Sequence, residues 1–195
     1  LASLERQWLD RRGALGLMTS AKDPSLSELL DRIVVEFSEK IAIKDHERTL
    51  TYSQLSELVS GLVKRLKDYH IKRGDRVAIF MNKTPELIAS MIAIAKIGAI
   101  YIPVDPLYPE GRLSMIFEDG MPVLVITNLI LKDKLPGGQM LIQTIEELVS
   151  DENRDSIAQK SKTNDRLRDV FSKSKEVISS KRDETEGYII FTSGS

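Results

Sequence analysis

Cysteine is absent from the 195-residue sequence. Without it the chain can form no disulfide bond, no thiolate metal site and no cysteine nucleophile. Histidine is scarce as well: His46 lies in a predicted turn and His70 near a predicted helix end, and each stands alone. Isolated histidines of this kind are typical of surface or capping positions, and no spacing of histidines and carboxylates matches a metal site. We therefore expect no metal ligand and no catalytic residue in this chain.

An excess of one charge and long apolar runs are also missing. The 28 Lys and Arg residues nearly balance the 29 Asp and Glu residues, which gives a formal net charge of -1. This balance provides no electrostatic reason to expect a nucleic-acid partner. No apolar run approaches the roughly 18 residues that a membrane span needs, so no membrane partner is expected. A chain without cysteine is compatible with the cytoplasm, which is the compartment we predict.

Hydrophobic residues make up 42% of the chain, close to the value for globular proteins. From residue 25 onward, apolar strands alternate with amphipathic helices. The pattern predicts strands at 41–43, 76–80, 100–102 and 122–127, and helices at 25–37, 51–66, 84–97 and 109–120. This alternation predicts an α/β fold, a mostly parallel sheet with helices on both faces.

Local signals mark where these elements begin and end. Ser25 and Thr51 each precede a Glu or Gln by three residues, which predicts capping boxes. Thr84 is expected to cap the third helix, with Pro85 at its first position. Gly98 and Gly120 are expected to end helices, and Pro103 to break the strand that begins at Ile100.

Composition divides the chain into regions. Residues 1–24 are predicted to be a leader or linker, and residues 25–195 to form the main domain. Within this domain, residues 139–142 predict a short strand and residues 144–149 a short helix. Residues 151–186 are dense in Lys, Arg, Asp, Glu and Ser and are expected to form a solvated excursion.

The last eight residues pass from an apolar strand, residues 188–191, into a small polar turn. Thr192, Ser193 and Ser195 offer hydroxyl groups, and Gly194 permits backbone angles that other residues avoid. Such a loop can surround phosphate oxygens. It lacks the Walker pattern, however, and taken alone this composition is equally common in ordinary loops.

Three segments together resemble the adenylate-forming, AMP-binding superfamily. Residues 50–55 (LTYSQL) resemble its LTYxEL motif, with Gln54 in place of Glu. Residues 95–113 (AKIGAIYIPVDPLYPEGRL) resemble LKAGAAYVPIDPxYPxxR, and residues 188–195 (YIIFTSGS) resemble the first half of YIIFTSGSTGxPKG. The second motif is closest in form to the amino-acid adenylation domains of nonribosomal peptide synthetases.

The resemblance implies an ATP-dependent ligase that uses Mg²⁺ and activates a carboxylate, in this branch an amino acid, as an acyl-AMP. It further implies transfer of the acyl group to a phosphopantetheine thiol on a carrier-protein domain. Of the family's phosphate loop, Thr192, Ser193, Gly194 and Ser195 can be carried over. The loop lysine, the metal-binding Glu, the ribose-binding Asp and the catalytic Lys are expected beyond Ser195. We therefore expect an N-terminal fragment that is inactive alone.

Two alternatives stay open. The chain could belong to an acyl- or aryl-CoA ligase, against which the form of the second motif argues, or to a non-catalytic α/β binding module. Within the second motif, Asp105 and Tyr108 are better explained as parts of a rigid turn than as catalytic groups, because three prolines restrict this segment. Arg112 is expected to be a structural or surface partner.

Overall fold

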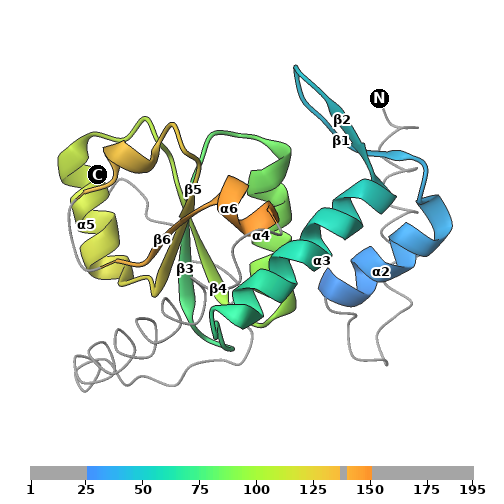
Figure 1. Cartoon of the computed structure of the whole chain (residues 1–195), viewed down its shortest axis with the longest axis horizontal. Coiled ribbons are helices and arrows are strands. Elements are labelled where there is room, and N and C mark those ends of the chain that lie inside the picture. The colour runs from blue at the N-terminus through green and yellow to red at the C-terminus, as the bar shows by residue number, and fades with distance from the viewer. Residues whose placement is uncertain (1–25, 137–139, 151–195) are drawn as a thin grey trace, which may run out of the picture.

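The computed structural model describes residues 26–136 and 140–150, which form an α/β unit (Figure 1). Its elements, in chain order, are α2 (Leu26–Phe37), β1 (Ile41–Lys44), β2 (Thr49–Thr51), α3 (Tyr52–Asp68), β3 (Arg76–Phe80), α4 (Pro85–Lys96), β4 (Ile100–Val104), α5 (Glu110–Gly120), β5 (Leu124–Thr127), the 3-10 turn η1 (Lys132–Lys134), β6 (Ile142–Thr144) and α6 (Ile145–Val149). The predicted leader, the charged excursion and the capping residue Ser25 lie outside the described residues.

Four strands form a parallel sheet in the order β4-β3-β5-β6. The register is regular: Val77 of β3 lies beside Tyr101 of β4 on one side and beside Leu124 of β5 on the other. The predicted α/β class with a parallel sheet is confirmed. Strands β1 and β2 form a separate antiparallel pair, which lies at the N-terminal end of α3 (Figure 1).

Each face of the sheet has its own apolar core. On one face, Val77 and Ile79 of β3 pack in a cluster with residues of α2, α3, α4 and α6. On the other face, Ala78 and Phe80 pack with α5. Because β4 and β5 lie on opposite sides of β3, the two right-handed crossovers must place α4 and α5 on opposite faces.

Helix α3 shows how local sequence builds this unit. Thr51 and Gln54 form the predicted capping box, since each side chain binds the other residue's backbone N–H. Four members of the predicted apolar stripe are buried: Leu55, Val59, Leu62 and Leu66. Arg65 is buried as well, and its Nη2 donates to the carbonyl oxygen of Ser150 at the end of α6 at 2.5 Å.

Two predicted boundaries are wrong. Pro103 does not break β4, which continues to Val104. The N–H of Ile100 points to the β3 side, where it binds the carbonyl of Asp75, so alternation turns the backbone nitrogen of Pro103 to the outer side. In the described sheet β4 is an edge strand, and a proline there removes no bond to β3.

Helix α5 ends at Gly120, as predicted, and Met121 after it adopts the left-handed conformation with φ 40°. The last strand, however, differs from prediction. The strand expected at 139–142 is observed at Ile142–Thr144, and Thr144 caps α6 through a second capping box. By contrast, Gly98 adopts the left-handed conformation expected after α4, with φ 71°.

Candidate functional site

The carboxyl ends of β3, β4, β5 and β6 meet at one edge of the parallel sheet. In open α/β sheets, ligands bind outside this edge, preferentially where the strand order reverses. Here the chain moves from β3 to β4 on one side and then returns to β5 on the other, so the reversal lies between β3 and β5. At this point the buried Thr127 hydroxyl donates to the carbonyl oxygen of Phe80 at 2.9 Å and holds the two strand ends together.

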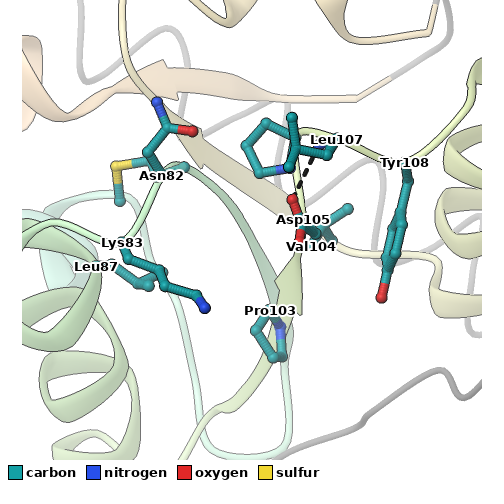
Figure 2. Close-up of a pocket in the computed structure, with 10 residues that line it drawn as sticks. Asn82, Lys83, Leu87, Pro103, Val104, Asp105, Leu107 and Tyr108 are labelled. Atoms are coloured by element: carbon teal, nitrogen blue, oxygen red, sulfur yellow. Dashed lines mark hydrogen bonds between the residues drawn. The ribbon is translucent and has the colours of Figure 1, made fainter.

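A cavity of about 570 Å³ opens at the same edge, on the β4 side of β3 (Figure 2). Its walls come from the loop between β3 and α4, the first turn of α4, the end of β4 and the loop before α5. The lining residues are Met81, Asn82, Lys83, Leu87, Pro103, Val104, Asp105, Pro106, Leu107 and Tyr108. Most of these side chains are apolar, and Figure 2 shows the Lys83 side chain directed between Leu87 and Pro103.

The loop after β4 is held by its own hydrogen bonds. The Asp105 carboxylate accepts the N–H of Leu107 at 2.9 Å, and the Asp105 carbonyl accepts the N–H of Tyr108 at 3.1 Å. The guanidinium of Arg112 lies 4.8 Å from the centre of the Tyr108 ring, a cation–π contact. These hydrogen bonds agree with the rigid turn expected at Asp105 and Tyr108, and Arg112 stacks on this turn.

The loop after β3 leads into α4 differently from the prediction. Thr84 is the residue before the helix and Pro85 begins it, but within the described residues the Thr84 side chain makes no capping hydrogen bond. The N–H of Leu87 is instead bound to the Thr84 carbonyl at 3.1 Å. The first turn of α4 is instead linked to the β1–β2 hairpin through an ion pair of Glu86 with Arg48.

Sequence reasoning missed the two polar residues on the β3 side of this cavity, Asn82 and Lys83. They belong to no family motif quoted above. Their only signal is position, since both follow the buried strand 76–80 directly and precede a helix. In a parallel sheet, polar residues at that position reach the ligand-binding edge.

The expected phosphate-loop residues Thr192, Ser193, Gly194 and Ser195 lie outside the described residues. Within residues 26–136 and 140–150, no group of three His, Asp or Glu side chains comes together to hold a metal ion. In the same part of the chain, no helix combines the length and apolar character needed to cross a membrane. Among the described residues, the two groups with clearly shifted pKa values, Asp45 and Tyr69, do not line the cavity.

Comparison with known proteins adds independent findings. Residues 30–195 match the model of the AMP-binding enzyme family. The chain is 34% identical over 125 residues to syringomycin synthase SyrB1 of Pseudomonas syringae pv. syringae, covering 64% of this chain and 20% of that protein. It is 33% identical over 130 residues to malpinin synthetase of Mortierella alpina, covering 67% of this chain and 2% of that protein.

Among solved structures, the NpsA N-terminal subdomain of Klebsiella oxytoca, in complex with 3-hydroxybenzoyl-AMSN, matches with a TM-score of 0.61. The identity is 27%, and the match covers 67% of this chain and 32% of that chain. The chain therefore spans about a third of this subdomain and a still smaller share of the synthetases.

Proposed function

Because the chain belongs to the AMP-binding enzyme family, we propose that it forms the N-terminal part of the large domain of an ATP-dependent ligase. The ligase activates a carboxylate, an amino acid in this branch, as an acyl-AMP and releases pyrophosphate. It then passes the acyl group to a phosphopantetheine thiol on a carrier-protein domain, in the cytoplasm. The main observation in favour of this proposal is the family match over residues 30–195, a range that includes all three motifs in their family order.

In this proposal Thr192, Ser193, Gly194 and Ser195 contact the β- and γ-phosphates of ATP. Hydroxyl groups and closely approachable amides can stabilise the charge that develops when the carboxylate attacks the α-phosphate. Mg²⁺ would neutralise further phosphate charge in that step. Since the described residues bring together no carboxylate cluster, we assign no Mg²⁺ ligand among them.

The described residues serve as the scaffold of this site. The strand end at Thr127 and the turn at Asp105 are each fixed by hydrogen bonds at the carboxyl edge of the sheet. A rigid edge of this kind is where α/β folds present ligand-binding loops. The peptide-synthetase relatives and the form of the motif at residues 95–113 favour an amino acid over the substrates of acyl- or aryl-CoA ligases.

The test is ATP–pyrophosphate exchange, measured with each of the common amino acids on a chain that includes the family sequence after Ser195. Exchange stimulated by one amino acid supports the proposal and identifies the substrate. Exchange only with fatty or aryl acids assigns the protein to the CoA-ligase branch. If a well-folded preparation exchanges with no acid, the chain is instead a non-catalytic module of the same fold.

The 195-residue chain provides a second test. We expect calorimetry to detect weak ATP binding or none, because these 195 residues contain only the first half of the family's phosphate-loop motif. Tight ATP binding to this chain would contradict the assignment of the phosphate site to the complete loop.

A further inference from the structure

The cavity beside β4 is separate from the point where the strand order reverses. That point lies between β3 and β5, whereas the cavity is enclosed by the loops that follow β3 and β4. Its volume of about 570 Å³ falls within the roughly 300–1,000 Å³ of small-molecule sites. Such sites combine mainly apolar walls with a few polar groups that fix the orientation of the ligand.

The walls of this cavity are preformed. Pro103 and Pro106 restrict the backbone on the β4 side, and the Asp105–Leu107 hydrogen bond closes the turn between them. On the β3 side Met81 is only 4% exposed, and the N–H of Thr84 binds the Asn82 carbonyl at 2.9 Å. Ligand binding would therefore require little further ordering of the protein, and the entropy lost on binding would be small.

The charged groups at the cavity are Lys83 and Asp105. The Asp105 carboxylate is turned toward its own loop, where it accepts the Leu107 N–H (Figure 2). The Lys83 side chain is directed into the cavity, between Leu87 and Pro103 (Figure 2). The cavity thus presents mainly apolar walls, a few neutral polar groups and one ammonium group to a ligand.

We propose that this cavity binds a small apolar molecule that carries one anionic group, of the class of aryl or short alkyl carboxylates. The hydrocarbon part contacts Leu87, Pro106 and Leu107, and the anionic group contacts Lys83. The residues assigned to this site do not include the phosphate loop, so the test below uses neither ATP nor the proposed ligase activity.

The test uses the 195-residue chain and the fluorescent aromatic sulfonate 1-anilinonaphthalene-8-sulfonate. We expect a single class of saturable site, from which 4-phenylbutyrate displaces the probe. Leu107→Glu, at a rim side chain that is 88% exposed, should weaken probe binding by about tenfold, because it removes apolar contact and adds a like charge. The matched control is Ile130→Glu, 84% exposed in the loop after β5 and outside the cavity, which should leave binding unchanged.

Lys83→Gln separates charge from packing. It should weaken 4-phenylbutyrate binding roughly two- to fivefold, the range of an exposed ion pair. It should leave binding of the neutral 4-phenylbutanol unchanged. The control variant Lys132→Gln should leave binding of both ligands unchanged. Equal losses from Leu107→Glu and Ile130→Glu, equal effects of Lys83→Gln on both ligands, or no saturable binding to the unaltered chain would each overturn the proposal. Urea midpoints of all variants verify that each is folded.

Discussion

Tyr69 at the end of α3 and Gln143 in β6 are joined by a buried hydrogen bond whose strength can be measured. The Tyr69 hydroxyl donates to Oε1 of Gln143 at 2.7 Å, and the two residues are 4% and 1% exposed. Tyr69→Phe removes one oxygen and leaves the acceptor inside the core without this donor. A buried polar group that loses its partner costs about 1–3 kcal/mol, so we expect Tyr69→Phe to lower the free energy of unfolding by about 1–2 kcal/mol.

Gln143→Leu is the second substitution, and together with Tyr69→Phe it makes a double-mutant cycle. It removes the acceptor and also the bond from Nε2 of Gln143 to the carbonyl of Ile142 at 2.6 Å, so its cost should be about 2–3 kcal/mol. Once the acceptor is gone, the part of the Tyr69→Phe cost that comes from this hydrogen bond is no longer present. In the Gln143→Leu background it should cost less than half of its original value, which gives a coupling energy of about 1 kcal/mol.

The assay is urea denaturation of the unaltered protein, the two single variants and the double variant, monitored by circular dichroism. The slope of the unfolding free energy against urea concentration should be the same for all four. Tyr52→Phe is the control, because the Tyr52 hydroxyl makes no hydrogen bond within the described part of the chain. It should change stability little. If Tyr69→Phe costs the same in both backgrounds, the two side chains are not coupled and the reasoning from their geometry is refuted.

The buried Tyr69 hydroxyl should also affect how stability depends on pH in alkaline solution. Burial, followed by the nearby Glu147 carboxylate, raises the pKa of the Tyr69 hydroxyl above its ordinary value of 10.0. The folded state then keeps a proton that the unfolded chain loses, so this contribution is complete below pH 10.0 and falls as the pH rises through the raised pKa. Urea titrations above pH 10.0 should show a shallower loss of stability in Tyr69→Phe than in the unaltered protein. An identical loss in both would contradict the assignment.

Three further predictions concern Gly98, Thr51 and Asp45. Gly98→Ala should destabilise the fold by about 1–2 kcal/mol, because Gly98 has φ +71° and a Cβ there would lie 3.1 Å from Arg73 Cγ. Gly61→Ala should stabilise the fold by about 0.5–1 kcal/mol, because apart from the neighbouring backbone of α3 no described heavy atom lies within 4 Å of the added carbon; thermal unfolding compares the two variants. Thr51→Ala should cost about 1 kcal/mol by urea denaturation and Thr84→Ala clearly less, since only the Thr51 side chain caps its helix; equal costs would refute this. The N–H groups of Arg48 and then Glu47 lower the pKa of the Asp45 carboxyl below 3.8, so its contribution to the hairpin should be lost only as the pH falls through that lowered pKa; a carboxyl NMR titration at or above 3.8 would contradict it.

Local signals in the sequence determined much of the fold. The capping box at Thr51 and the apolar stripe of α3 follow from spacing along one helix, so they could be predicted without knowledge of any partner. The α/β class followed from the alternation of apolar strands and amphipathic helices. The rigid turn at Asp105 was likewise readable, because its prolines and its short carboxylate side chain act on their immediate neighbours.

The candidate site was less accessible to the sequence. Lys83 and Leu107 are far apart along the chain, and they line one cavity only because β3 and β4 are adjacent and parallel. The motif at residues 95–113 indicated one wall, whereas the other wall belonged to no recognised pattern. The four predicted phosphate-loop residues, 192–195, remain a prediction.

The sequence by itself determined which segments become helices and strands and which face of each is apolar, because those properties depend on residues a few positions apart. The tertiary structure alone decided the strand order β4-β3-β5-β6 and the burial of Arg65 and Gln143. It also decided that Pro103 could remain within a strand. These outcomes depend on contacts between segments distant in sequence, where the hydrogen bond or edge position that makes a polar residue or a proline tolerable is supplied by another element.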